Sequence, residues 1–301
     1  MTNINFKHSL VFFNLCILIS PFYSIVNYEP IILCLFLILF LGISHGSLDN
    51  IKGAKLIKIL GYKSIFLFYF FYILLSLVII LLWIIFPNTI LLIFLIVGSY
   101  HFGREDTIIR YKSNFFLAEI LYFLKGSSVI IAPLYFSREA TIEIFNILNF
   151  NVFENSLFNN YFLIFFLILS FLSSILLSNK KNLNFKTIMI VDFLSIIILN
   201  YFFTPVLAFM IYFCFLHSIR HSISLISELD NSFKVGFRKF IKKAIPLTLV
   251  TTIMFVIAIY MLNNFYKLDE AIYKVIFIGL ASLTFPHILL EYLLEKNEKR
   301  A

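Results

Sequence analysis

The sequence contains few charged residues. Only 13% of its 301 residues are Asp, Glu, Lys or Arg, whereas 61% are hydrophobic. Soluble globular chains carry about 25% charged and about 45–50% apolar residues, so this composition excludes a soluble domain. It also excludes an intrinsically disordered chain, because disorder requires low hydrophobicity and high net charge. The composition therefore predicts a polytopic membrane protein.

Cysteine is scarce as well. Cys16, Cys34 and Cys214 all lie inside apolar runs and show no paired spacing, so we expect buried thiols rather than disulfides or a zinc site. No small-residue cleavage site follows the first apolar run, which argues against a cleavable signal peptide. The formal net charge of +8 arises from short basic clusters between apolar runs. Such clusters are typical of membrane topology, and we expect no nucleic-acid partner.

Long apolar runs are abundant. A membrane-crossing helix needs about 20 mostly apolar residues, and ten segments meet this requirement: about 9–26, 29–46, 63–86, 88–103, 114–135, 158–178, 186–203, 205–227, 244–263 and 272–294. We therefore predict an all-α helical bundle of about ten (8–10) transmembrane helices, with residues 1–301 forming a single transmembrane domain. The break at Phe86-Pro87-Asn88 fits either a tight hairpin or one broken helix. Pro205 separates the seventh and eighth segments.

The basic residues indicate the orientation of the chain. With ten spans, 19 of the 24 Lys and Arg residues fall on the side that holds both termini. Cytoplasmic loops carry such an excess, so we expect a multi-pass cell-membrane protein with cytoplasmic N- and C-termini. The longest outer loop is expected at about residues 136–157.

Ionisable residues inside the predicted spans need a reason, because a charge at the membrane centre costs about 2.5–3.5 kcal/mol on insertion scales. Of the six histidines, His8 lies near the N-terminus. The other five fall toward the cytoplasmic side of four spans: His45, His101, His217, His221 and His287. Five imidazoles at one depth suggest one shared site.

The spacing of two histidines supports a metal site. His217 and His221 stand four residues apart, so they share one helix face with Cβ atoms about 5–6 Å apart. The alternative is a pair of histidines that hydrogen-bond between helices. Imidazole ligands suit iron, copper and zinc alike, so ligand type does not choose the metal. One HxxxH pair offers too few ligands for a di-iron centre, and two histidines on adjacent turns cannot both be axial ligands of one haem.

Acidic residues accompany the histidines. Asp49 follows His45 by four residues, and Asp106 follows His101 by five. Metal-bound histidines usually donate their second N–H to an oxygen acceptor, so both aspartates are candidate supporting residues. The alternative is that they pair with nearby Lys or Arg residues at the headgroups.

The four histidine-containing segments resemble the Brp/Blh family, the integral-membrane β-carotene 15,15'-dioxygenases that supply retinal to microbial rhodopsins. The matching segments are Gly42-Ile43-Ser44-His45-Gly46-Ser47-Leu48-Asp49, His101-Phe102-Gly103 with Asp106, His217-Ser218-Ile219-Arg220-His221, and Thr284-Phe285-Pro286-His287. Their order and approximate separations agree from about residue 30 to residue 295.

The resemblance implies a mononuclear Fe(II) held by His45, His101, His217 and His221, with His287 as a nearby supporting residue. It implies O2-dependent cleavage of the central double bond of β-carotene into two all-trans retinals, destined for a rhodopsin. β-Carotene is a hydrocarbon that partitions into the lipid bilayer, so its enzyme needs an apolar tunnel in which shape and apolar contact supply the binding.

Two other functions remain compatible with the residues alone. One is a transporter or channel that uses the intramembrane histidines as relay or transit sites. It is expected to show inverted repeats and broken helices in corresponding halves, and neither is clear in the sequence. The other is a zinc-dependent intramembrane lipid hydrolase.

Overall fold

A computed structural model describes residues 2–23, 30–107, 115–150, 159–178 and 183–298, and these residues form helices joined by short turns. The helices, in chain order, are α1 (Thr2–Tyr23), α2 (Ile31–Leu37), η1 (Ile38–Gly42), η2 (Ile43–Leu48), α3 (Asp49–Ile59), α4 (Phe66–Ile85), α5 (Pro87–Glu105), α6 (Phe115–Phe136), α7 (Arg138–Ile147), α8 (Asn160–Leu177), α9 (Leu183–Phe202), α10 (Pro205–Ile211), η4 (Tyr212–Ser218), α11 (Ile219–Leu229), α12 (Phe233–Leu262) and α13 (Leu268–Glu298). The predicted all-α class is confirmed.

Nine helices within the described residues are long and apolar enough to cross a membrane. The predicted span at 88–103 corresponds to α5, which is a helix of 19 residues but is not among the nine. Its second half carries His101, Arg104 and Glu105, which lower its apolar character. The chain is therefore a multi-pass helical membrane protein in which α5 carries polar groups into the bundle.

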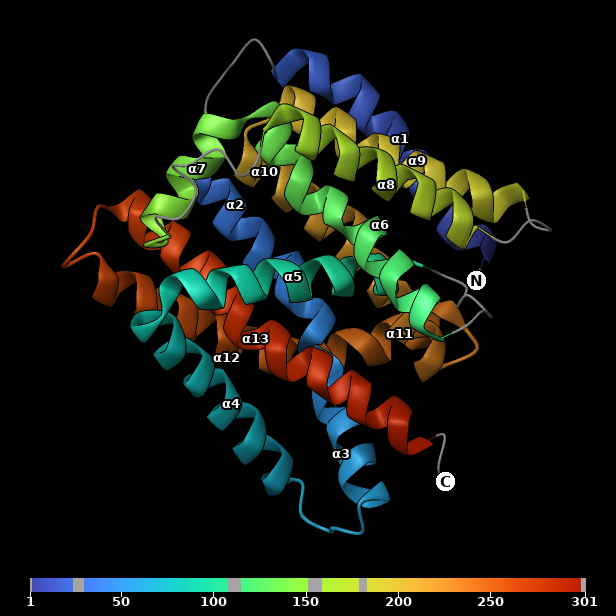
Figure 1. The fold of residues 1–301 in the computed structure, drawn as a ribbon. Coiled ribbons are helices and arrows are strands. Elements are labelled where there is room, and N and C mark those ends of the chain that lie inside the picture. The colour runs from blue at the N-terminus through green and yellow to red at the C-terminus, as the bar shows by residue number, and fades with distance from the viewer. Residues whose placement is uncertain (1, 24–29, 108–114, 151–158, 179–182, 299–301) are drawn as a thin grey trace.

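The two prolines that the sequence analysis singled out both begin a helix. Pro87 stands in the first turn of α5, directly after Phe86 ends α4 with φ −130° and ψ 60°. Pro205 likewise begins α10 after a short break that follows α9. Proline fits this position because its missing N–H has no helical partner there. The break at Phe86 is a sharp turn, after which α4 and α5 pack against each other as a V (Figure 1).

The predicted start of the ninth span is wrong. The ninth span was expected to begin at residue 244, after a basic loop, but α12 begins at Phe233. Its first turns carry five basic residues: Lys234, Arg238, Lys239, Lys242 and Lys243. Lysine and arginine are good helix formers, and their long stems can lie along apolar surface while the charges reach water. The basic cluster therefore extends the helix beyond its apolar part.

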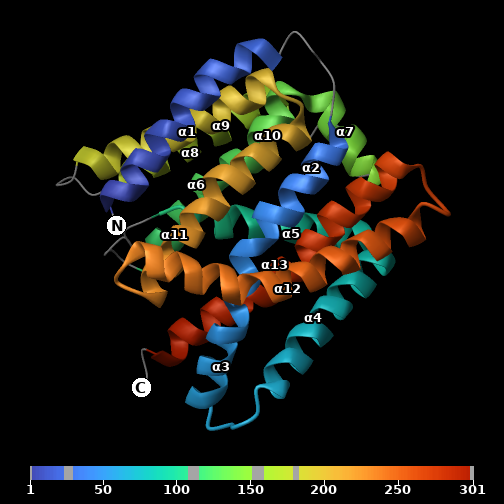
Figure 2. The same ribbon diagram turned by 180° about the vertical axis from the view of Figure 1, so that it is seen from behind.

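The two termini lie at the same end of the bundle (Figures 1 and 2). The junction between α11 and α12 lies at this end as well, whereas α7, the α4–α5 turn and the α12–α13 turn lie at the opposite end. With α5 counted beside the nine long apolar helices of the described residues, the number of candidate spans matches the predicted ten.

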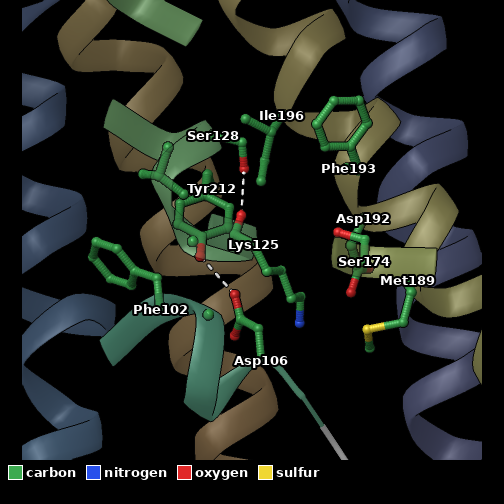
Figure 3. A pocket seen from close by; sticks show the side chains of 13 residues that line it. Phe102, Asp106, Lys125, Ser128, Ser174, Met189, Asp192, Phe193, Ile196 and Tyr212 are labelled. Atoms are coloured by element: carbon green, nitrogen blue, oxygen red, sulfur yellow. Dashed lines mark hydrogen bonds between the residues drawn. The ribbon is translucent and has the colours of Figure 1, made fainter. Parts of the chain in front are cut away.

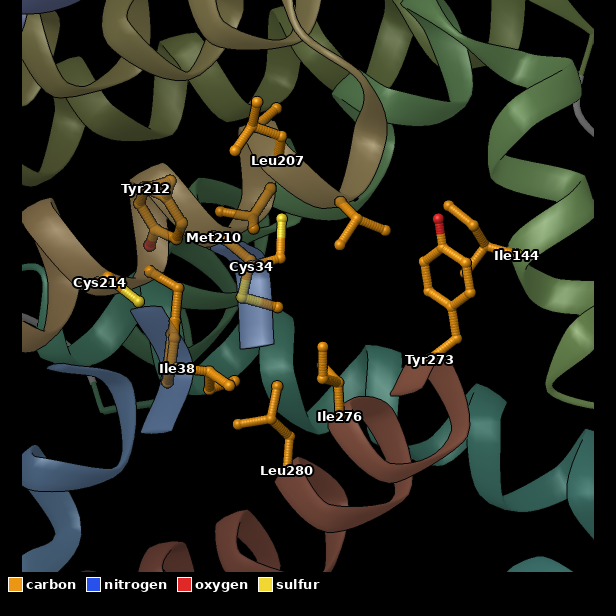
Figure 4. Close-up of a cluster of buried hydrophobic side chains, with 14 of the residues drawn as sticks. Cys34, Ile38, Ile144, Leu207, Met210, Tyr212, Cys214, Tyr273, Ile276 and Leu280 are labelled. Atoms are coloured by element: carbon orange, nitrogen blue, oxygen red, sulfur yellow. The ribbon is translucent and has the colours of Figure 1, made fainter. Parts of the chain in front are cut away.

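The main core gathers buried side chains of α2, η1, α5, α10, η4 and α13. Cys34, Ile38, Met210, Cys214 and Ile276 are fully buried in it (Figure 4). The three cysteines are buried and form no disulfide, as predicted. By contrast, α4 and α12 expose large apolar side chains along most of their length, which is expected of helices whose solvent is lipid.

Candidate metal centre

Four of the five clustered histidines are described, and their rings lie in contact. The ring centroid of His101, on α5, lies 5.2 Å from that of His217 on η4 and 5.5 Å from that of His287 on α13. The centroid of His221, on α11, lies 6.0 Å from that of His287. His101, His217 and His287 are buried, and the side chain of His221 is 9% exposed. Because η4 continues directly into α11, three helical segments bring these imidazoles to one place inside the bundle.

The fifth histidine, His45, belongs to η2, which packs against η1, α11 and α12. Its side chain lies outside the described part of the structure. Of the four ligands that the family resemblance implies, the structure thus brings together His101, His217 and His221. It places His287 between His101 and His221, although the sequence analysis had assigned His287 only a supporting role.

Each of three histidines faces a carboxylate at Nδ1. Nδ1 of His217 lies 3.0 Å from Oδ1 of Asp106, and Nδ1 of His287 lies 2.9 Å from both oxygens of Asp49. Because an ionised carboxylate only accepts hydrogen bonds, both rings donate through Nδ1. Nδ1 of His221 lies 3.5 Å from Oε2 of Glu105.

A second layer of hydroxyl groups holds the two aspartates. Tyr212 donates a hydrogen bond of 2.5 Å to Oδ2 of Asp106, and Tyr72 donates one of 2.9 Å to Oδ2 of Asp49. Both aspartates are buried, and burial of a carboxylate is costly unless it is paired and hydrogen-bonded. The tyrosines and histidines together meet this requirement.

Beyond Asp106 lies a buried ionic network. Nη1 of Arg220 lies 4.0 Å from Oδ1 of Asp106 and 2.7 Å from Oδ2 of Asp192. Nη2 of the same arginine donates to the hydroxyl of Ser9 at 2.8 Å. The sequence analysis did not assign a role to Asp192, and its ion pair with Arg220 accounts for its presence inside a span.

A small pocket lined in part by charged side chains adjoins this network; its empty volume, including space open to the surroundings, is about 310 Å³. Lys125 reaches into it, with Asp106 on one side and Asp192 on the other (Figure 3). The ammonium group of Lys125 donates to the hydroxyl of Thr107 at 3.0 Å. The network therefore links α1, α5, α6, α9 and α11 behind the histidine cluster.

Irregular helix turns lie next to the segments that carry the clustered histidines. Both η1 and η4 are π-helical, with wider turns than an α-helix, and such turns are frequent at functional sites. The two segments pack against each other at Gly42, where a Cβ atom would lie 2.8 Å from the ring of Phe213. A glycine at this position therefore permits the close approach of η1 to η4. The ring of Phe213 in turn stacks on that of His217, with centroids 5.6 Å apart.

A second glycine contact sets the position of α5. A Cβ atom on Gly103 would lie 1.7 Å from the backbone oxygen of Tyr122 on α6. The absence of a side chain therefore lets the end of α5 pack directly against α6, two residues from His101. By contrast, a Cβ atom on Gly46 would meet only Oδ2 of Asp49, at 4.0 Å, so no close backbone contact depends on that glycine.

Sequence reasoning missed Glu105 and the two tyrosines. Glu105 follows His101 by four residues on α5, the same spacing as that of Asp49 from His45, so this spacing was a usable signal. Tyr72 and Tyr212 carried no such signal, since the sequence has 16 tyrosines and their aspartate partners lie 23 and 106 residues away. The aspartates' described histidine partners, His287 and His217, are also distant in sequence.

Comparison with known protein families identifies the chain. Residues 36–295 match the profile of the family described as Beta-carotene 15,15'-dioxygenase. The chain belongs to this family. A curated member, the Beta-carotene 15,15'-dioxygenase of Uncultured marine bacterium 66A03, is 29% identical over 275 residues, which cover 88% of this chain and 94% of that protein. No solved structure matches the chain.

The donor set of this β-carotene dioxygenase family member fits a metal ion. Metal-ligating histidines usually donate one ring N–H to a carboxylate, which fixes the tautomer and leaves the other nitrogen to ligate. His217 and His287 have this geometry at Nδ1, His221 approaches it, and the Nε2 atoms of all three are buried. Neutral imidazoles suit iron, so the residues present are compatible with the Fe(II) that the resemblance implies.

One further group of ligand atoms lies at the edge of the cluster. Asp49, His287 and Glu291 each offer one ligand atom, and these atoms lie within 4.8 Å of one another. Glu291, however, forms an ion pair with Lys52, and Asp49 already accepts from His287. Both carboxylates of this group therefore already have partners within the protein.

Proposed function

We propose that this chain is an iron(II)-dependent dioxygenase that cleaves the central 15,15' double bond of β-carotene with O2 and releases two all-trans retinals. One observation carries the proposal: the carboxylate-held histidines gather inside the membrane bundle of a chain that belongs to the β-carotene 15,15'-dioxygenase family.

His45, His101, His217 and His221 are the proposed iron ligands. His287 is a further candidate, because its ring lies almost as close to His101 as that of His217 does, 5.5 Å against 5.2 Å. Fe(II) bound to neutral imidazoles would supply the activation of O2. The protein's part is to fix the rings through Asp106, Asp49 and Glu105 and to present the midpoint of the polyene beside them, since orientation supplies much of the catalytic advantage.

The surroundings of the cluster suit a hydrocarbon substrate. The ring centroid of Phe102 lies 5.0 Å from that of His217, and that of Phe213 lies 5.6 Å from it. These aromatic faces exclude water and offer apolar contact to a polyene. Binding then rests on shape and apolar contact, as expected of a ligand without polar groups.

The bilayer is the proposed source of the substrate, and the cell membrane is the proposed location. The basic bias of the sequence and the shared end of the two termini support cytoplasmic N- and C-termini. The histidines then lie toward the cytoplasmic side, where iron is accessible, while O2 dissolves in the membrane. The retinal product is proposed to serve a rhodopsin.

Co-expression in bacteria that produce β-carotene tests the proposal. Cells with the wild-type chain should lose their yellow colour and accumulate retinal, whereas cells with His217→Ala at equal expression should stay yellow. Metal analysis of the purified protein should show about one iron. Unchanged colour without retinal would reject the oxygenase and favour a transporter, and stoichiometric zinc with no iron-dependent activity would favour the hydrolase.

A further inference from the structure

An apolar pocket lies between α5, α6, α7, α10 and α13. Its empty volume, including space open to the surroundings, is about 580 Å³. Its walls include Phe94, Gly98, Val129, Ile144, Val206 and Phe277. Thr141 contributes the one polar side chain among the lining residues, and its hydroxyl donates to backbone carbonyls of Pro133 and Ser137. The pocket therefore suits an uncharged hydrocarbon group.

The pocket reaches the histidine cluster at one end. Phe102 lines the pocket, and its ring centroid lies 5.0 Å from that of His217 and 5.7 Å from that of His101. Phe209 also lines the pocket, with its centroid 6.1 Å from that of Phe102. Thr141, Ile144 and Phe145 line it from α7, which lies at the end of the bundle opposite the termini. The pocket thus extends from the histidines toward α7.

We propose that this pocket binds one half of the carotenoid, with a terminal ring toward α7 and the polyene passing Phe102 to the histidines. The assignment rests on the proposed function. Cleavage of a central bond requires that the two halves of the substrate extend in different directions from the metal, and the pocket supplies an apolar path for one of them. Phe102 and Phe209 hold the polyene at the inner end and so fix which double bond lies beside the histidines.

Gly98 offers a way to fill the pocket without disturbing the fold. It lines the pocket from α5, and a Cβ atom added there would meet only the ring of Phe102, at the ordinary contact distance of 3.8 Å. Gly98→Ala and Gly98→Leu therefore add bulk mainly to the empty space. Ile96 lies on the same helix and is 49% exposed, so Ile96→Phe is a matched control that adds bulk outside the pocket.

The protein carries an internal reporter of the pocket. Its single tryptophan, Trp83, is buried, and its ring centroid lies 6.1 Å from that of Phe94, which lines the pocket. All-trans retinal has the size of one substrate half and absorbs where tryptophan emits. Retinal bound in the pocket should therefore quench the emission of Trp83.

The experiment titrates purified wild-type, Gly98→Ala, Gly98→Leu and Ile96→Phe proteins with all-trans retinal in detergent. We expect the wild type and Ile96→Phe to bind equally, Gly98→Ala to bind more weakly, and Gly98→Leu to lose about tenfold in affinity, or about 1.4 kcal/mol. Iron content and elution profile should be unchanged in all four. If Gly98→Leu does not purify, the pocket assignment is tested by the titration of Gly98→Ala alone.

Two failures are distinguishable. If the wild type makes retinal from β-carotene but the Gly98 variants bind retinal as the wild type does, the pocket assignment is overturned and the proposed function stands. If the wild type makes no retinal in the colour assay, the proposed function fails whatever the titration gives.

Discussion

The carboxylate of Asp106 offers the sharpest test of how the protein holds its proposed metal. It accepts hydrogen bonds from Nδ1 of His217 and from the hydroxyl of Tyr212, at 3.0 and 2.5 Å. Asp106→Asn keeps the size of the side chain but removes its charge. The amide oxygen cannot serve both donors as a carboxylate does, and the amide NH2 group brings a donor against them.

Loss of such a carboxylate partner typically lowers metal affinity about 10–100-fold, which corresponds to about 1.4–2.8 kcal/mol. This range agrees with the strength of one hydrogen bond to a charged group, about 1.5–3 kcal/mol. We therefore expect Asp106→Asn to need about 10–100-fold more free Fe(II) for half-occupancy, and retinal formation to fall in proportion to occupancy.

The assay measures bound iron at buffered Fe(II) concentrations, with retinal formation recorded in parallel. Asp230→Asn is the control, because Asp230 precedes α12, pairs with Lys239 at 2.6 Å and is hydrogen-bonded to the backbone N–H of Ser232. Asp230→Asn should bind iron as the wild type does. Asp106→Asn protein that elutes normally and fills with iron at the wild-type concentration would refute the reasoning.

Three further predictions follow from the site and the topology. Alanine at any of His101, His217 and His221 should reduce retinal formation at least about tenfold at matched expression. His8→Ala removes a hydrogen bond to the backbone of Phe215 and should act mainly through stability. Wild-type retinal formation by His217→Ala would show that His217 is not a ligand. Gly103→Ala places a Cβ atom 1.7 Å from a backbone oxygen and should lower stability by about 1–3 kcal/mol, measured as a loss of thermal stability in detergent. Gly98→Ala should not lower the stability. Equal melting temperatures of the two variants would contradict the close α5–α6 contact. A reporter that is active only in the cytoplasm should work when fused after residue 301 or between residues 228 and 233, but not within 136–157. An impermeant thiol reagent applied to intact cells should label Asn151→Cys and not Ser232→Cys; the native cysteines are buried and should not react. Labelling of Ser232→Cys would overturn the topology.

Hydropathy alone predicted most of the helices, because a membrane-spanning helix requires a long apolar run that is visible in the sequence. It predicted the start of α12 poorly. The run from Phe233 to Lys243 is basic, and helix propensity continues through it, so apolar length underestimates the helix. Polar residues also affect α5. It was predicted as a span, but its polar second half keeps it outside the nine described helices that are long and apolar enough to cross a membrane.

The gathering of the histidines was predictable for a similar reason. Once the spans are ordered, the depth of each residue follows from its position in its span, and five histidines share one depth. Depth does not give rotation about the helix axis, however. Sequence reasoning could therefore bring His287 to the right level but could not place its ring between those of His101 and His221.

The partners of the histidines illustrate the limit of spacing arguments. Asp49 stands near His45 in sequence, yet its described partner is His287, 238 residues away. Asp106 follows His101 but hydrogen-bonds to His217, 111 residues away. Such contacts depend on which helices pack together, and α3 with α13 is a long-range pairing that no local pattern encodes.

The membrane gives these carboxylates a second role. Inside a bilayer, no water molecule accepts a hydrogen bond from a buried N–H group, and each such group without an acceptor costs several kcal/mol. A histidine that ligates through one nitrogen must therefore find a protein acceptor for the other. Asp49 and Asp106 serve as those acceptors and, because they come from different helices than the rings they hold, the same hydrogen bonds join α3 to α13 and the end of α5 to η4. The orientation of the proposed ligands and the packing of the bundle thus depend on the same contacts, so the candidate site lies where several helices meet rather than on one of them.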